Sequence, residues 1–434
     1  MRSIQSARPR VMPWALGLGL GLYLSACGGG DDAIVPVAPD VPKLPLVGSA
    51  TGVLTDAPVQ GVAFTTPSGV VGTTDAQGQY TYNPGDTVSF KLGALALGSV
   101  PAAPLVTPLE LAAGSADKLQ NLLVLLQSLD DDGNAANGIK IVPAAAVAVS
   151  TGVDLAQAAA AFASTANTGL TAAMAAGGIS RAITSTSLAT AHFLGQSKAL
   201  LSSQVWVGSF DKGAYVVVQR FGAKGEYLEA EIGASEGGGR SGLEYGTALA
   251  TAVDGRGFKL APVIEIDTNG TWGLSHLSAC ERVSVTGGQL SYMEAPASCV
   301  TDTPPTALSK ADNDPAGIVG VWTGDSDTLV KTQTFVFWAD GRYAMLDPEG
   351  DPTTPSHTSC GGPGVEYGTY SYDAASKDVK ILSVSVDTNG CAGLNDGTPG
   401  GSGMARFKLT LSSDGKTAAV VFSDASGQIF RVSR

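Results

Sequence analysis

The acidic run at residues 130–132 is the first feature of the chain that could bind an ion. Asp130, Asp132 and Asn134 stand at positions one, three and five of a short polar segment that also contains Asn137. Oxygen atoms at that spacing can converge on Ca²⁺. A complete loop of this type has Gly at position six and Glu at position twelve, whereas this segment has Ala and Ile there. We therefore expect either a calcium site formed by these four residues or a turn in which Asp and Asn side chains bond the local backbone.

Two glutamates in matching segments are the other candidates for a site. Glu244 lies in Leu-Glu-Tyr-Gly-Thr and Glu366 lies in Val-Glu-Tyr-Gly-Thr, and both segments have the composition of a β-strand. A glutamate that points into a β-barrel is buried and needs a hydrogen-bonding partner. We expect each glutamate to be an internal polar tie, an edge residue that faces water, or a polar group of a ligand cavity.

The chain lacks the motifs that usually mark a catalytic centre. It contains no G-x-S-x-G, H-E-x-x-H or G-x-x-x-x-G-K-[ST] sequence. The glycine-rich segment 237–242 lacks the flanking strand and helix of a phosphate-binding motif, so it indicates a loop. The chain has three histidines, and His192 is expected to be a hydrogen-bonded or packed residue of a helix. We predict that the protein is not an enzyme and that it has no cofactor, calcium apart.

The composition indicates a folded, mainly β protein. The 434 residues suffice for roughly two to four domains, and 44% of them are hydrophobic. The 56 glycines and the low aromatic content of 6% suit short strands joined by tight turns. The formal net charge of −13 repels phosphate groups, which argues against a nucleic-acid partner.

Residues 1–26 have the properties of a bacterial export signal. Three arginines precede an apolar run at residues 15–24, which is too short to span a bilayer as a helix. The sequence Leu24-Ser25-Ala26-Cys27 that follows resembles the lipobox of bacterial lipoprotein precursors. This resemblance implies cleavage before Cys27, acylation of its sulfur and new amino group, and anchoring in the lipid bilayer. Because Gly follows the cysteine where Asp would favour retention in the inner membrane, we expect the outer membrane of the cell envelope. The alternative is an ordinary secretory leader that contains a cysteine by chance.

Four further cysteines indicate disulfide bonds in an exported chain. They are Cys280, Cys299, Cys360 and Cys391, and four cysteines allow three connectivities. Proximity in the sequence favours the pairs Cys280–Cys299 and Cys360–Cys391. A zinc site is the less favoured alternative, because the chain has no C-x-x-C spacing.

The N-terminal part of the mature chain predicts a tether and then a β-module with helices. Residues 27–47 are rich in Gly and Pro and predict the tether. Residues 48–204 are expected to form a β-sandwich module with packed helices. Its strand-like runs and turns resemble those of the carboxypeptidase-regulatory-like and adhesin-type modules of bacterial surface proteins. The residues that carry this resemblance are 51–62, 73–82, 83–86 and 87–92.

Three segments of this module predict helices. Ser115 is a good N-cap for a helix whose leucines at 119, 122, 123 and 126 share one face. The alanine-rich segments 154–163 and 187–201 predict two more helices.

The C-terminal half of the chain is a duplication. Val205-Trp-Val-Gly recurs as Val321-Trp-Thr-Gly, and Gly225-Glu-Tyr recurs as Gly341-Arg-Tyr, both 116 residues later. Short β-rich runs and Asn-Gly or Asp-Gly turns predict about eight antiparallel strands in each copy. We therefore expect two related β-barrel-like domains, at 205–300 and 318–434, joined by a Pro-containing linker at 301–317.

The barrel copies suggest what the protein does. Their early tryptophan and the Gly-x-Tyr strand are similar to those of lipocalin- and avidin-like barrels. Trp206, Trp272, Trp322 and Trp338 are expected mainly in the core, and exposed tryptophans would suit stacking on sugars. The function that we expect is non-enzymatic adhesion or ligand binding at the envelope, with an unidentified protein, glycan or small molecule as the partner. The alternatives are a lipocalin-like carrier of a small apolar ligand and a glycan-binding accessory protein.

Overall fold

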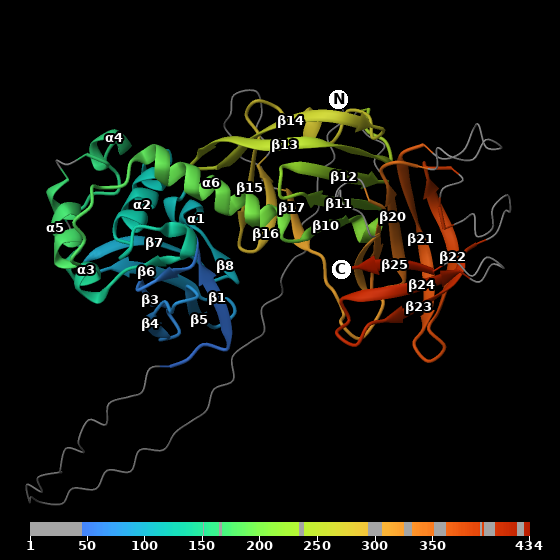
Figure 1. The fold of residues 1–434 in the computed structure, drawn as a ribbon, viewed down its shortest axis with the longest axis horizontal. Coiled ribbons are helices and arrows are strands. Elements are labelled where there is room, and N and C mark those ends of the chain that lie inside the picture. The colour runs from blue at the N-terminus through green and yellow to red at the C-terminus, as the bar shows by residue number, and fades with distance from the viewer. Residues whose placement is uncertain are drawn as a thin grey trace, which may run out of the picture. The chain divides into compact units, whose positions relative to one another are not determined.

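The computed structural model describes most of the chain beyond its N-terminal segment (Figure 1). The described residues are 46–150, 152–164, 167–233, 238–293, 306–324, 332–350, 362–390, 393–394, 404–422 and 429–434. The protein is mainly β there, with two closed barrels of eight antiparallel strands and a group of helices, which confirms the predicted fold class. No helix in the described part is long and apolar enough to cross a bilayer.

The N-terminal module contains small sheets that share one hydrophobic core. The first sheet has the order β5 (Gln79–Tyr82), β1 (Ala50–Leu54) and β8 (Leu105–Val106). The second has the order β4 (Val71–Thr73), β3 (Ala63–Thr65), β6 (Thr87–Leu92) and β7 (Leu95–Pro101), and β2 (Val59–Gln60) pairs with β9 (Ile139–Lys140). Buried and exposed residues alternate along β6, as they do in a strand with one face on a core. The ring of Tyr80 packs edge-on against Phe64 and Phe90 in that core.

The helices of the module follow capping and burial rules. They are α1 (Pro108–Ala112), α2 (Ala116–Ser128), α3 (Pro143–Ala148), α4 (Ala159–Phe162), α5 (Thr168–Ala176) and α6 (Thr186–Ser202). The side chain of Ser115 accepts a hydrogen bond from the Lys118 N–H, as predicted for the N-cap of α2. The predicted leucine face of α2 is buried, and α6 corresponds to the helix predicted at 187–201.

The helix predicted at 154–163 is largely absent, and α4 covers only its last residues. The side chain of Asp154 accepts a hydrogen bond from the Ala156 N–H and forms a local turn. The carbonyl oxygens of Leu155 and Gln157 accept hydrogen bonds from the Asn121 side chain at 3.0 and 2.7 Å. These carbonyl groups are therefore satisfied without a helix.

The first barrel runs from β10 to β17 and closes on itself. Its strands are β10 (Val205–Phe210), β11 (Tyr215–Phe221), β12 (Glu226–Ile232), β13 (Gly242–Asp254), β14 (Gly257–Asp267), β15 (Arg282–Thr286), β16 (Gln289–Met293) and β17 (Thr306–Lys310). Closure comes from β17, in which Lys310 pairs with Trp206 of β10. The expectation that residues 301–317 form a linker is therefore wrong for 306–310, because a barrel needs an eighth strand to satisfy both edges.

The second barrel repeats this architecture. Its strands are β18 (Gly320–Gly324), β19 (Thr334–Phe337), β20 (Arg342–Asp347), β21 (Gly364–Asp373), β22 (Asp378–Asp387), β23 (Arg406–Leu411), β24 (Thr417–Phe422) and β25 (Ile429–Ser433). It closes where Thr323 and Gly324 of β18 pair with β25.

The two barrels share details that single residues explain. Trp206 and Trp322 are fully buried, and their indole N–H groups donate to the carbonyl oxygens of Leu201 at 3.0 Å and Ile318 at 2.8 Å. The core position predicted for these two tryptophans is confirmed. Each barrel also has a bulge after the repeated tyrosine of its fourth strand, where Gly246 or Gly368 meets a carbonyl oxygen closely. A Cβ there would lie 2.1 Å or 1.9 Å from that oxygen, so only glycine fits.

Candidate functional site

A row of polar side chains crosses four neighbouring strands of the first barrel. Gln219 on β11 pairs in register with Glu229 on β12, and Glu229 pairs with Glu244 on β13. Glu244 in turn pairs with Asp267 at the end of β14. Directly opposite residues on neighbouring antiparallel strands have their side chains on the same face. The register therefore places one amide and three carboxyl groups side by side.

Glu229 is at the centre of this row and is buried, with 3% of its surface exposed. Its carboxylate accepts hydrogen bonds from the Gln219 side chain at 2.7 Å and from the Leu274 N–H at 2.9 Å. Burial raises the pKa of Glu229 well above its ordinary value, and the neighbouring Glu231 and Glu244 raise it further.

Glu244 is fully buried and is held by Ser275. The Ser275 N–H and hydroxyl donate to its two carboxylate oxygens at 3.0 and 2.5 Å. Burial raises the pKa of Glu244, and the two hydrogen bonds from Ser275 lower it in part. Gly273 allows this approach, because a Cβ at that position would lie 2.6 Å from the carboxyl carbon of Glu244. Its φ of 101° also favours glycine.

Glu231 lies two residues beyond Glu229 on β12, so its side chain is on the same face of the strand. It is 4% exposed and accepts one hydrogen bond, from the Tyr215 hydroxyl at 3.3 Å. Its second oxygen, Oε2, is buried and has no hydrogen-bond partner among the residues that the structure describes. Burial raises the pKa of Glu231 to about 7, against the lowering effects of Tyr215 and of the nearby Asn269 side chain. Glu231 therefore changes charge near neutral pH.

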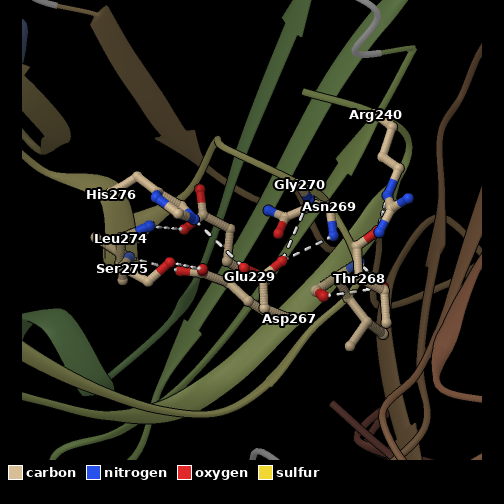
Figure 2. A network of polar contacts seen from close by, with 11 residues as sticks. Glu229, Arg240, Asp267, Thr268, Asn269, Gly270, Leu274, Ser275 and His276 are labelled. Carbon is tan, nitrogen blue, oxygen red and sulfur yellow. Dashed lines mark hydrogen bonds and ion pairs between the residues drawn. The ribbon is translucent and has the colours of Figure 1, made fainter. Parts of the chain in front are cut away.

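The segment after β14 folds over these acids and supplies their donors (Figure 2). One oxygen of Asp267 accepts from the backbone N–H groups of Asn269 and Gly270, each at 3.2 Å. Its other oxygen lies 3.3 Å from Nε2 of His276. The turn leads into the short 3₁₀ helix η3 (Leu274–His276), whose first two residues contact Glu229 and Glu244. The segment after β14 is thus hydrogen-bonded to three carboxyl groups of the row, those of Asp267, Glu229 and Glu244.

A cavity of about 400 Å³ opens beside this row, inside the first barrel. Its walls come from β11, β12, β16, β17 and the segment around η3, and they include both Glu229 and Glu231. The full lining is Tyr215, Val217, Gln219, Glu229, Glu231, Thr271, Trp272, Gly273, Leu274, His276, Leu277, Glu281, Tyr292, Thr306 and Leu308. Three of these residues are glutamates and none is Lys or Arg. A cavity of this size is in the range that holds a small organic molecule.

Aromatic rings form one side of the cavity. Trp272 packs edge-on against Tyr215, with ring centroids 5.5 Å apart, and Tyr215 stacks on Phe210. Tyr292 donates its hydroxyl hydrogen to the side-chain oxygen of Gln219, and the side-chain NH₂ group of Gln219 donates to Glu229. The site therefore combines flat apolar surfaces with acidic groups, which suits binding of a polar or charged organic molecule.

The second barrel retains only half of the row. Glu366 pairs in register with Asp387, as Glu244 does with Asp267, and it is fully buried and accepts a hydrogen bond from the Tyr343 hydroxyl. The positions that correspond to Glu229 and Gln219 are occupied by Met345 and Phe335. Within the described residues, the second barrel therefore keeps the Glu366–Asp387 pair of the row but has apolar side chains where the first barrel has Gln219 and Glu229.

The two glutamates predicted from the sequence are both buried inside strands, which excludes the alternative of an edge residue facing water. The more informative acids, Glu229 and Glu231, were missed because they do not recur in the second copy. One signal could have revealed them. They follow the repeated Tyr227 at intervals of two residues, so they belong on the face of the strand that Tyr227 occupies.

The residues predicted to bind calcium lie in one turn after α2. Carboxylate oxygens of Asp130, Asp131 and Asp132 all lie within 4.8 Å of one another. Asp132 accepts hydrogen bonds from the Asn134 N–H at 2.8 Å and from the Asn137 side chain at 2.9 Å. These contacts are those of the backbone-bonded turn, which was the alternative expectation. The calcium site remains a prediction.

Cationic side chains lie beside the same turn. The side chain of Lys140 forms an ion pair with Asp131 at 2.6 Å, and the backbone N–H of Lys140 donates to one oxygen of Asp130. Arg181 donates to the carbonyl oxygens of Ser128 and Asp130. A calcium ion would have to bind next to these two positive charges.

The remaining predicted residues are only partly open to test. Cys280 is buried and disulfide-bonded, whereas Cys299, Cys360 and Cys391 lie outside the described residues, so the two predicted pairings stay predictions. Cys27 also lies outside the described residues. His192 is hydrogen-bonded as expected, with Nε2 2.9 Å from the carbonyl oxygen of Asp56.

No protein-family model matches this chain, and no curated protein sequence matches it either.

Proposed function

We propose that the protein is a non-enzymatic binding protein of a bacterial cell envelope, and that its ligand is a small molecule held in the first barrel. The observation that carries this proposal is the cavity of about 400 Å³ beside Glu229 and Glu231. Ligand sites of small-molecule binding proteins are concave, largely preformed and lined by aromatic and apolar side chains with a few placed polar groups. The lining of this cavity has that composition.

Two observations favour a small ligand over adhesion to a large surface. Among the described residues, the large hydrophobic side chains that are most exposed are Leu, Ile, Val or Met, and none is aromatic. Adhesive and glycan-binding faces usually present aromatic residues. Trp272 lies in the wall of the cavity instead.

The side chains that line the cavity also favour a carrier of a polar ligand over a carrier of an apolar one. A carrier of an apolar ligand would have an apolar interior, because a buried carboxyl group without a matching partner costs free energy. Three glutamates in the lining argue for a ligand with polar or charged groups. The apolar-ligand alternative therefore has less support than a polar one.

The envelope location is supported by the sequence alone. The short apolar run and Cys27 suit a lipidated precursor, and the Gly- and Pro-rich segment 28–47 suits a tether that holds the folded part away from the lipid. Such a location would let the first barrel meet small molecules outside the reducing cytosol.

The proposal can be tested with a panel of neutral, cationic and anionic molecules small enough for the cavity. We expect at least one of them to raise the melting temperature of the full chain. Leu277→Trp, which adds a large ring to the lining, should abolish the shift. Leu382→Trp, at an exposed position of the second barrel, is the matched control and should leave the shift intact. Ligands that stabilise the protein equally in the Leu277→Trp variant would contradict binding in this cavity.

A further inference from the structure

We propose that the cavity of the first barrel selects a small organic cation, with a protonated amine placed at Glu231 and a flat apolar body against Trp272 and Tyr215. This inference rests on the proposed binding function and adds the chemical class of the ligand. It is carried by the charge of the lining, by one unpartnered carboxylate oxygen and by the aromatic wall.

The charge of the lining is one-sided. Glu229, Glu231 and Glu281 contribute acidic groups, and no Lys or Arg side chain belongs to the lining that the structure describes. Acidic walls around a cavity of low dielectric raise the local concentration of cations and repel anions. The site is thus unsuited to a carboxylate or phosphate ligand.

One carboxylate oxygen of Glu231 lacks a hydrogen-bond donor, and a bound cation could supply one. Its Oε1 accepts from Tyr215, while Oε2 is buried and accepts no hydrogen bond within the described part of the chain, although the Asn269 side chain lies close enough to lower the pKa of Glu231. Burying a charged oxygen without a partner costs free energy, and hydrogen bonds between ions are the strongest available compensation. An ammonium group in the cavity would donate to this oxygen.

The equivalent position in the second barrel shows what a satisfied carboxylate looks like. Asp347 lies opposite Gly364, as Glu231 lies opposite Gly242, and both acids are buried. Asp347 accepts hydrogen bonds from the Gln333 side chain at 3.0 Å and from the N–H groups of Gly350 and Glu349 at 2.8 and 3.2 Å. Both oxygens of Asp347 therefore accept hydrogen bonds from the protein, whereas Oε2 of Glu231 accepts none.

The aromatic wall suits an organic cation better than a metal ion. Trp272 and Tyr215 provide ring surfaces beside the acids, and aromatic faces attract organic ammonium groups and flat apolar bodies. Metal ions need several ligand atoms close together. Within the described residues, the acids of the first barrel form no group of three or more ligand atoms within 4.8 Å of one another, unlike Asp130–Asp132.

Isothermal titration of the full chain with phenethylamine tests the inference. Its neutral analogue 2-phenylethanol and its anionic analogue 3-phenylpropionate have a similar ring and chain, and the titrations are done near pH 8, where Glu231 is ionised. We expect the amine to bind at least about tenfold more tightly than the alcohol, which is the size of one charge-assisted contact. The anion should bind most weakly. Equal affinity for amine and alcohol, or no binding of the amine at millimolar concentration, would overturn the inference.

Two matched variants locate the effect. Glu231→Gln keeps the shape of the side chain and should weaken amine binding about tenfold, with little change for the alcohol. Asp347→Asn removes the equivalent buried charge of the second barrel and should leave amine binding unchanged. An unchanged amine affinity in a folded Glu231→Gln variant would contradict the role of Glu231. A neutral panel ligand that Leu277→Trp blocks and Glu231→Gln leaves unaffected would preserve the binding function and refute its preference for cations.

Discussion

Glu229 on β12 and Glu244 on β13 lie directly opposite each other, and both are buried. Like charges at opposite positions of two strands destabilise a sheet. The barrel accommodates the pair because Gln219, the Leu274 N–H and Ser275 donate to the two carboxyl groups and because burial raises both pKa values. The first barrel therefore holds protons that the unfolded chain would release, which has consequences for its stability.

The stability of the protein should fall as the pH rises from weakly acidic to neutral. Burial raises the pKa of Glu231 from 4.5 to about 7, so the folded state binds this proton more tightly than the unfolded state. The extra stability is fully present below the unfolded pKa and is lost as the pH rises through about 7. It amounts to on the order of 3 kcal/mol. Urea unfolding followed by tryptophan fluorescence at several pH values measures it.

Glu231→Gln should reduce that pH dependence and leave the part that Glu229 and Glu244 contribute, because glutamine does not titrate. Asp373→Asn is the control, since hydrogen bonds from Ala375 and Ser376 lower the pKa of this exposed carboxyl and keep it ionised throughout the same range. A pH profile that Glu231→Gln leaves unchanged would show that other groups cause it.

Gly273→Ala should destabilise the first barrel by about 3 kcal/mol, because it strains the backbone and pushes a methyl group against the carboxyl of Glu244. Gly288→Ala separates the two effects. Gly288 also has a positive φ, of 82°, but no atom lies within 4 Å of a Cβ there, so we expect a cost of about 1 kcal/mol. Chemical unfolding of both variants is the measurement, and equal costs would mean that contact with Glu244 contributes nothing.

Cys27→Ser should move the protein from the membrane fraction to the soluble fraction of bacteria that express it. The physical reason is the loss of the acyl chains, each buried CH₂ of which contributes about 0.8 kcal/mol of membrane affinity. Ser25→Ala keeps a small residue before the cleavage site and should stay with the membranes. Membrane fractionation with immunodetection checks both, and a Cys27→Ser protein that remains with the membranes would refute lipid anchoring.

Millimolar calcium should raise the melting temperature of the N-terminal module within the full chain, as measured by calorimetry, if Asp130 and Asp132 bind it. Asp132→Asn should remove the shift. Asp75→Asn alters a carboxylate of the same module that accepts from the N–H groups of Gln77 and Gln79, so the calcium-induced shift should persist there. A calcium response that is absent in the unmodified protein would leave this segment as a simple turn.

Local patterns in the sequence determined much of this fold. The leucine spacing after Ser115 predicted α2, since one helical face must be buried. The recurrence of Gly-x-Tyr and Glu-Tyr-Gly-Thr predicted two related barrels and pointed to Glu244 and Glu366. Strand β17 could not be recognised in this way, because a short segment among prolines becomes a strand only when both neighbours need its hydrogen bonds.

The acidic row was decided by tertiary structure. Along β12 the residues Leu228, Ala230 and Ile232 alternate with Glu229 and Glu231, a pattern that by itself suggests glutamates facing water. Alternation shows which side chains share a face, but it does not show which face is enclosed when the sheet closes. In the closed barrel the glutamates line the cavity, and the apolar residues are buried in a separate cluster on the opposite face. Pairing in register across β11 to β14 then brings Gln219, Glu229, Glu244 and Asp267 together, and no spacing along the chain encodes that register.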